Sequence, residues 1–218
     1  VVSKQLLPVY DKPMIYYPLS ILINSGVKEI MIITTPEDQH LFKRLLGNGK
    51  HWNVSIEYSI QEKPNGIAQA LLISSDWLNG SNTILILGDN LFFGPKINNI
   101  IKGAIKNNNG ATIFGYQVSD PNRFGVIEFD DDKNVISIIE KPVKPKSNWA
   151  ATGLYIYNNQ ASIRTKNLEL SKRGELEITD LNNIYLDNNE LKVVLLDKNY
   201  SWLDTGTHKT LLEASNFV

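Results

Sequence analysis

The sequence contains no cysteine in 218 residues, which excludes disulfides, thiolate metal sites and a cysteine nucleophile. This composition fits the reducing cytoplasm, where we expect the protein to act. No apolar run approaches the ~18 residues of a membrane span and no signal peptide is visible, so we expect no membrane association. The net charge is −1 and no block of lysine or arginine exceeds two residues, which argues against a surface for polymeric nucleic acid.

What the sequence does contain is an ordinary globular composition, 42% hydrophobic and 21% charged, with enough length for one good-sized domain. Its first half alternates strand and helix patterns, which is typical of a parallel sheet with covering helices. After residue 110, strands follow one another closely, which favours antiparallel additions to one edge. We predict an α/β fold with strands at 27–34, 54–60, 83–87, 111–118, 125–130, 135–140, 149–157 and 191–196, and helices around 15–23, 41–45, 67–74, 97–105, 178–185 and 211–215.

The stretch from Thr83 to Leu87 is typical of a buried strand, and it stops abruptly at Gly88-Asp89-Asn90. Ligands of open α/β sheets lie outside the carboxyl ends of such strands. Asp89 would therefore stand where a hard cation and a phosphate could be held, and Gly88 would let backbone approach closely. The alternative explanation is a strand followed by an ordinary Asx turn.

A second carboxylate, Asp204, also follows an apolar strand, and we expect it to open a helix. Mg²⁺ is bound by one or two carboxylates together with phosphate oxygens and waters, so two carboxylates at separate strand ends suit it. The spacing alone does not show that Asp89 and Asp204 meet. The three histidines have no spacing typical of a transition-metal site.

Basic residues and glycines near predicted loops are the next candidates. Lys4, Lys141 and Arg173 could neutralise the oxygens of a phosphorylated substrate, although solvated surface charge is the alternative for each. Lys141 lies between a strand end and a proline, where a stiff backbone can aim its side chain. Gly66 and Gly125 adjoin predicted elements, where a ligand could lie against the backbone; ordinary turns are the alternative.

Eight motifs occur in order along the chain. They are SKQLLP from Ser3, YDKPMIYYPL from Tyr10, LGDN from Leu87, FGVIEF from Phe124, EKP from Glu140, ATGLY from Ala151, RGELEITD from Arg173 and WLDTGTH from Trp202. With this set the chain resembles the glucose-1-phosphate thymidylyltransferases, the sugar nucleotidyltransferases that open dTDP-L-rhamnose synthesis. The similarity covers essentially all 218 residues.

The resemblance implies a Rossmann-like nucleotidyltransferase fold and the reaction that this family catalyses. The implied reaction is dTTP + α-D-glucose 1-phosphate → dTDP-glucose + pyrophosphate, with Mg²⁺ as cofactor and a homotetramer as the assembly. The sugar phosphate oxygen attacks the α-phosphorus in line and no residue becomes covalently modified, so the protein contributes positioning and charge stabilisation.

The resemblance also implies roles for residues at matching motif positions. Asp89 and Asp204 would bind Mg²⁺, and Lys4 would contact the triphosphate. Gln61 and Gly66 would hold the thymine base, because a glutamine amide can pair with a base edge. The sugar side would be contacted by Asn90, Gly125, Glu140 and Thr152, and the glucose phosphate by Lys141 and Arg173.

The sequence departs from the family at both ends. The family's glycine-rich loop should lie immediately before Ser3, and its C-terminal helices beyond Phe217, and neither is in the sequence. We therefore expect residues 1–218 to form a single nucleotidyltransferase domain that lacks both and that, by itself, turns over little. The alternatives are a sister sugar-1-phosphate nucleotidyltransferase that uses UTP or CTP, and a nucleotide-binding module without catalysis.

Overall fold

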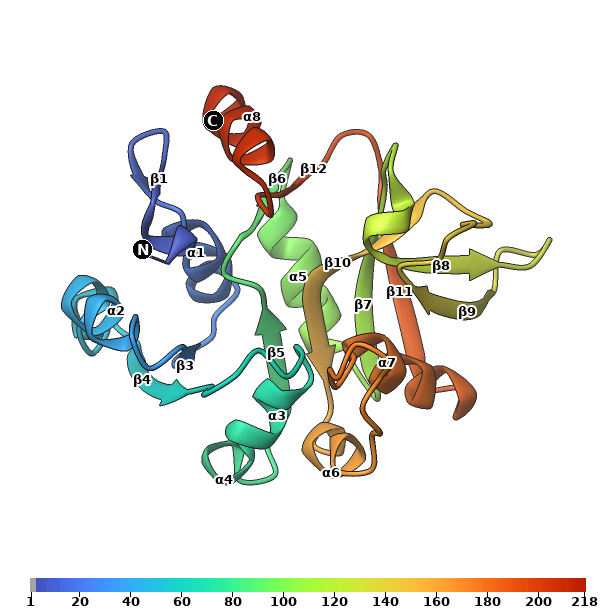
Figure 1. Cartoon of the computed structure of the whole chain (residues 1–218), viewed down its shortest axis with the longest axis horizontal. Coiled ribbons are helices and arrows are strands. Elements are labelled where there is room, and N and C mark those ends of the chain that lie inside the picture. Colours follow the sequence, from blue (N-terminus) through green and yellow to red (C-terminus); the bar gives the residue numbers. More distant parts are fainter. Residues whose placement is uncertain (1–2) are drawn as a thin grey trace. The chain divides into compact units, whose positions relative to one another are not determined.

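The computed structural model describes residues 3–218, and it confirms the α/β class with a mixed sheet. The chain forms two compact units (Figure 1). Unit 1 comprises residues 3–63, Ile86–Gly103 and Asn199–Val218, and unit 2 comprises Pro64–Leu85 and Ala104–Lys198. The single domain expected over residues 1–218 stays a prediction.

Unit 1 contains three two-stranded ladders. β3 (Glu29–Thr34) and β4 (Ser55–Ile60) are parallel, as the strand–helix alternation predicts, because a helix connects them. β6 (Asn90–Phe93) is antiparallel to β12 (Ser201–Asp204), which lies far along the sequence. The remaining elements are the hairpin β1 (Pro8–Val9) and β2 (Lys12–Pro13), the helices α1 (Tyr16–Asn24), α2 (Gln39–Leu46), α5 (Ile97–Lys106) and α8 (His208–Phe217), and the 3-10 turns η1 (Lys4–Leu6) and η2 (Lys50–Trp52).

A capping box begins α8 shortly after β12. The hydroxyl of Thr207 accepts a hydrogen bond from the backbone N–H of Thr210 at 3.1 Å, and the Thr210 hydroxyl lies 3.0 Å from the Thr207 nitrogen. This reciprocal capping box satisfies backbone donors that the first helical turn leaves unpaired. Asp204 is the last residue of β12, and α8 begins only at His208, so Asp204 does not open the helix as the sequence predicted.

Unit 2 is built on a six-stranded sheet with the order β11-β7-β10-β8-β9, in which β5 also pairs with β10. β11 is parallel to β7, whereas the β7–β10, β10–β8 and β8–β9 pairs are antiparallel. The antiparallel edge expected from the short connections is confirmed. The strands are β5 (Thr83–Ile86), β7 (Ala111–Gln117), β8 (Gly125–Phe129), β9 (Val135–Glu140), β10 (Trp149–Tyr157) and β11 (Leu191–Leu196); the helices are α3 (Gln69–Ile73), α4 (Ser75–Leu78), α6 (Ala161–Thr165) and α7 (Ile178–Asp187), with a 3-10 turn, η3 (Pro121–Arg123).

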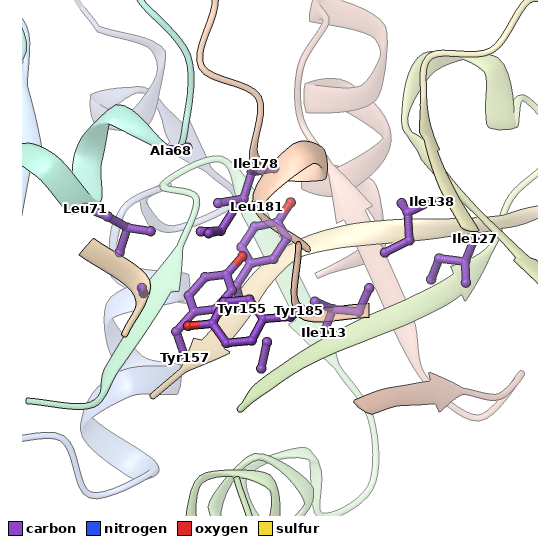
Figure 2. Close-up of a cluster of buried hydrophobic side chains, with 12 residues drawn as sticks. Ala68, Leu71, Ile113, Ile127, Ile138, Tyr155, Tyr157, Ile178, Leu181 and Tyr185 are labelled. Carbon is purple, nitrogen blue, oxygen red and sulfur yellow. The ribbon is translucent and has the colours of Figure 1, made fainter. Parts of the chain in front are cut away.

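Three tyrosines lie in the core of unit 2, where α7 packs on β9 and β11 (Figure 2). Tyr155 and Tyr157 stack with ring centroids 6.2 Å apart, and Tyr185 lies 5.6 Å from Tyr157. The Tyr157 hydroxyl donates a hydrogen bond to Asn182 Oδ1 at 2.6 Å, as a buried tyrosine hydroxyl requires. Burial raises the pKa of Tyr155 and that of Tyr157, so both hydroxyls stay protonated at neutral pH.

The structure differs from the sequence-based expectation around residue 89. The strand that ends before Asp89 is half-buried and stops at Ile86. A turn at 88–89 then leads directly into β6, a strand that periodicity did not predict. Asp89 therefore lies between two strands. In the part of the chain that the structure describes, none of the helices combines the length and hydropathy of a membrane span.

Candidate active site

The carboxylate of Asp89 is held on both oxygens. Lys4, in the turn η1, forms an ion pair through Nζ with Asp89 Oδ2. The Asn90 amide donates from Nδ2 to Asp89 Oδ1 at 3.0 Å. The Asp89 side chain is 17% exposed, so it is shielded yet accessible. The structure thus brings together two candidates, Lys4 and Asp89, that lie far apart in the sequence.

The pairing of β6 with β12 brings Asp89 and Asp204 to neighbouring strand ends. Asp204 pairs with Asn90 in the antiparallel register. The next residue, Thr205, reaches the carbonyl oxygen of Asp89 through its backbone nitrogen at 3.1 Å and its hydroxyl at 2.8 Å. The proximity that sequence spacing could not establish is therefore a consequence of strand pairing.

The donor set at these strand ends fits a hard divalent cation. Two carboxylates supply anionic oxygens, the ligands that Mg²⁺ prefers. Across residues 3–218, histidine, aspartate and glutamate side chains form no group of three or more that could hold a metal ion. A cation bound by Asp89 and Asp204 would therefore take its other ligands from substrate oxygens and water, which is usual for Mg²⁺ in phosphoryl-transfer sites.

Glu140, in unit 2, is the centre of a second cluster of candidates. It ends β9, where it pairs with Gly125 of β8. The Thr179 hydroxyl donates to Glu140 Oε2 at 2.5 Å, while Lys141 Nζ and Arg173 Nη1 each lie 3.8 Å from Oε1. Two cations thus flank one carboxylate, and each is long enough and exposed enough to reach an anion instead.

Arg173 is held by acidic residues of its own loop. Its Nη2 lies 2.5 Å from Glu175 Oε2, and its Nε lies 3.3 Å from Oε1 of the buried Glu177. Burial lowers the pKa of Arg173, but the hydrogen bond to Glu175 and the charges of Glu177, Glu175 and Glu140 outweigh it, so the net pKa is raised. The guanidinium is therefore fixed in orientation and stays charged.

The backbone around Lys141 and Gly125 supports this cluster. Lys141 has a left-handed φ of +42°, and its N–H donates to the Phe124 carbonyl at 2.9 Å, which fixes the direction of its side chain. A Cβ at Gly125 would lie 3.0 Å from the Thr179 hydroxyl and 3.4 Å from Glu140 Oε2. Glycine at position 125 therefore leaves room for the Thr179–Glu140 hydrogen bond.

Thr152 is fully buried, and its hydroxyl has no hydrogen-bond partner. It lies in β10 where the ladder to β7 is irregular, between Ala151 and Tyr155. A buried hydroxyl without a hydrogen-bond partner lowers the free energy of unfolding by about 1–3 kcal/mol, so a threonine at this position is unfavourable for stability. The sugar contact implied by the resemblance stays a prediction, and it requires the hydroxyl to become accessible.

Thr152→Val is expected to raise the free energy of unfolding by about 1 kcal/mol, because it removes a buried hydroxyl that is not hydrogen-bonded. Thr165→Val is the matched control: Thr165 is equally buried, but its hydroxyl donates to the Ala161 carbonyl at 2.8 Å, so its loss should destabilise. Urea denaturation of both variants gives the comparison. Equal destabilisation would show that the Thr152 hydroxyl is satisfied in solution.

The two candidates for base binding lie in different units. Gln61, in unit 1, donates its backbone N–H to Thr34 O at 2.8 Å, which continues the β3–β4 ladder by one residue. Gly66, in unit 2, has a φ of +102° and lies against the backbone of Leu176. That close approach accounts for glycine at position 66, and base contacts by both residues stay a prediction.

Sequence reasoning considered Trp202 only for stacking or core packing, and it did not predict that Trp202, Thr179 and Glu177 hold the candidates in place. Thr179 and Glu177 orient Glu140 and Arg173, and Trp202 donates from Nε1 to Asn90 Oδ1 at 2.6 Å. All three lie inside two of the eight motifs, RGELEITD and WLDTGTH. The signal available in the sequence was that these polar or indole side chains lie in the same motifs as candidate site residues.

Comparison with known proteins shows to which family this chain belongs. Residues 1–218 match the model of the nucleotidyl transferase family. The chain belongs to this family. It is 52% identical to the glucose-1-phosphate thymidylyltransferase of Neisseria meningitidis and 54% identical to that of Xanthomonas campestris, in each case over all of this chain and about three quarters of the relative.

Solved structures of nucleotidyltransferases share its fold. A Bacillus anthracis protein provisionally named glucose-1-phosphate thymidylyltransferase, crystallised with sucrose, is 39% identical, with a TM-score of 0.91 over 100% of this chain and 87% of that chain. A UDP-glucose pyrophosphorylase in complex with UDP-glucose is 19% identical, with a TM-score of 0.85 over 98% of this chain and 89% of that chain, and it shows the fold alone. The predicted nucleotidyltransferase fold is confirmed.

Proposed function

We propose that this nucleotidyltransferase transfers the thymidylyl group from dTTP to α-D-glucose 1-phosphate, producing dTDP-glucose and pyrophosphate. The observation that carries the proposal is an identity of 45–54% to relatives named glucose-1-phosphate thymidylyltransferase, over all of this chain and 71–75% of each relative. An oxygen of the sugar phosphate forms a bond to the α-phosphorus of dTTP. The bond from that phosphorus to the α,β-bridging oxygen breaks, and pyrophosphate leaves with its electron pair.

The residues proposed for the triphosphate and metal belong to unit 1. Asp89 and Asp204 would hold Mg²⁺, which neutralises charge on the transferring phosphoryl group when it is bound. Lys4 already lies against an anion, the Asp89 carboxylate, and would contact the triphosphate when it arrives. A lysine ammonium has three donors on a flexible stem, so it can exchange one oxyanion for another without rearranging the backbone.

The residues proposed for the sugar phosphate belong mainly to unit 2. Lys141 and Arg173 would bind the glucose phosphate; both now approach Glu140 Oε1 at 3.8 Å, beyond hydrogen-bond distance. Glu140 would accept hydrogen bonds from sugar hydroxyls, with Gly125 and Thr152 as further contacts. For Asn90, in unit 1, the sugar contact rests on the resemblance alone. The Thr179 hydroxyl occupies Glu140 Oε2, which orients the carboxylate.

The base would be held by Gln61 and Gly66. The Gln61 amide can hydrogen-bond a base edge, and the Gly66 backbone would lie against the base. These contacts decide between dTTP and other pyrimidine nucleotides. We further propose that the enzyme acts in the cytoplasm as a homotetramer, in the first step of dTDP-L-rhamnose synthesis, as the resemblance implies.

Pyrophosphate release tests the proposed function. The full-length gene product, given glucose 1-phosphate and Mg²⁺, should release pyrophosphate faster with dTTP than with UTP or CTP. Faster release with UTP or CTP would identify a sister enzyme. Nucleotide binding with no release from any triphosphate would identify a module without catalysis, and either result would overturn the proposal.

Lys141→Ala is expected to raise the Michaelis constant for glucose 1-phosphate roughly 10- to 100-fold and to change that for dTTP much less. The physical reason is the loss of a charged hydrogen bond worth about 1.5–3 kcal/mol to the sugar phosphate. Separate steady-state titrations of the two substrates give the comparison. Lys146→Ala is the control, because Lys146 pairs with Glu128. A change confined to dTTP would contradict the assignment.

A further inference from the structure

The indole of Trp202 is linked to the Asp89 carboxylate by the side chain of Asn90. Trp202 Nε1 donates to Asn90 Oδ1 at 2.6 Å, and Asn90 Nδ2 donates to Asp89 Oδ1 at 3.0 Å. Trp202 and Asn90 are both buried, with 6% and 1% of their surface exposed. The three side chains come from the paired strands β6 and β12 and the turn that precedes β6.

Chemistry allows only one orientation of the Asn90 amide in this chain. An indole N–H can only donate and a carboxylate can only accept, so the amide oxygen must face Trp202 and the amide nitrogen must face Asp89. A flipped amide would place its oxygen against a carboxylate oxygen and its NH₂ group against an N–H donor. Both contacts would be repulsive in a buried site, where unpaired polar groups are costly.

We infer that Trp202 is a positioning residue for the metal-binding carboxylate, acting through Asn90. Its N–H fixes the amide, and the amide fixes Oδ1 of Asp89, while Thr205 fixes the Asp89 backbone. Partners that orient a ligating carboxylate affect metal affinity about 10–100-fold. The inference rests on the proposed function only in that Asp89 binds a divalent cation.

The matched substitutions are Trp202→Phe, which keeps an aromatic ring and removes the N–H donor, and Trp149→Phe as control. Trp149 packs against Phe129 at a ring distance of 6.5 Å in unit 2. We expect Trp202→Phe to weaken Mn²⁺ binding, measured from the free-ion EPR signal, about tenfold, and Trp149→Phe to leave it unchanged. The concentration of Mg²⁺ for half-maximal pyrophosphate release should rise by a similar factor.

A double-mutant comparison separates positioning from general destabilisation. If Trp202 acts through Asn90, then adding Trp202→Phe to Asn90→Ala should cause no further loss of Mn²⁺ affinity. A melting temperature lowered by Trp202→Phe without a change in Mn²⁺ affinity would show a purely structural role and overturn the inference. Additive losses of affinity in the double variant would do so too.

A measurement on the unsubstituted protein covers the case in which Trp202→Phe does not fold. The indole N–H signals in ¹⁵N NMR can be assigned by Trp52→Phe, Trp77→Phe and Trp149→Phe, which leaves Trp202 by elimination. On titration with Mg²⁺ the Trp202 signal should shift more than the other three. An unmoved Trp202 signal at saturating Mg²⁺ would overturn the inference. Pyrophosphate release from dTTP and glucose 1-phosphate tests the proposed function separately.

Discussion

Replacing either Asp89 or Asp204 with asparagine is expected to reduce turnover by roughly 10²–10³-fold or more, because each change removes a charge from the site of one shared cation. Asp89 directly precedes β6 and Asp204 ends its partner β12, and Thr205, next to Asp204, is hydrogen-bonded to the carbonyl of Asp89. Since groups that act as a unit are not additive, the double variant should be little worse than the worse single variant.

The rate of pyrophosphate release, measured in the full-length protein at increasing Mg²⁺ concentrations, tests this expectation for the two single variants and the double variant. Both single variants should fold, because Asp89 and Asp204 are partly exposed residues at one end of the β6–β12 ladder and not core residues. Asp187→Asn, an exposed change at the end of α7, is the control and should leave turnover unaltered. Multiplicative losses in the double variant, or a normal Mg²⁺ dependence in either single variant, would mean that the two aspartates do not hold a common metal.

Gly66→Ala is expected to lower the free energy of unfolding by about 3 kcal/mol or more. A side chain at a positive φ costs about 1–2 kcal/mol, and overpacking adds about 1–3 kcal/mol. The added Cβ would overlap the carbonyl oxygen of Leu176 and lie 2.6 Å from its nitrogen. Both Asn65 and Ala68 form backbone hydrogen bonds to Leu176, so the two segments cannot separate without breaking them.

Gly174→Ala is the matched control for this prediction. Gly174 also has a positive φ, of +75°, but a Cβ there would meet nothing within 4 Å. Only the conformational cost of about 1–2 kcal/mol should remain. Urea denaturation of the whole protein, monitored by circular dichroism, gives both values. Equal losses would show that the approach of Leu176 does not constrain position 66.

Local patterns in the sequence were enough for the elements with clear periodicity. The spacing of the isoleucines in Ile97–Lys106 predicted the helix α5, and the alternation of apolar and polar residues in Ser55–Ile60 predicted the strand β4. The strand β6 was not predicted, because its four residues, Asn90–Phe93, are too few for a pattern. Its partner, β12, lies over a hundred residues away, and such long-range pairing leaves no local signal.

The same limit applies to the candidate site. The sequence identified Asp89 and Asp204 as carboxylates at strand ends, and only the β6–β12 register made them neighbours. It also identified Lys141 and Arg173 as cations near loops, but the carboxylates that orient Arg173 follow from how its own loop folds. Side-chain hydrogen bonds such as those of Trp202 and Thr179 join residues far apart in the chain, so no local pattern in the sequence predicts them.

The hydrogen bond from Thr205 to Asp89 has a consequence for the order of events during translation. The two residues are 116 positions apart. At synthesis rates on the order of 5–20 residues per second, Thr205 is added roughly 6 to 23 s after Asp89. Most of unit 2 is made in that interval and can begin to fold on the ribosome. Asp89 reaches the ribosome exit well before its partner strand does, so a nascent chain cannot assemble the paired carboxylates until β12 has emerged.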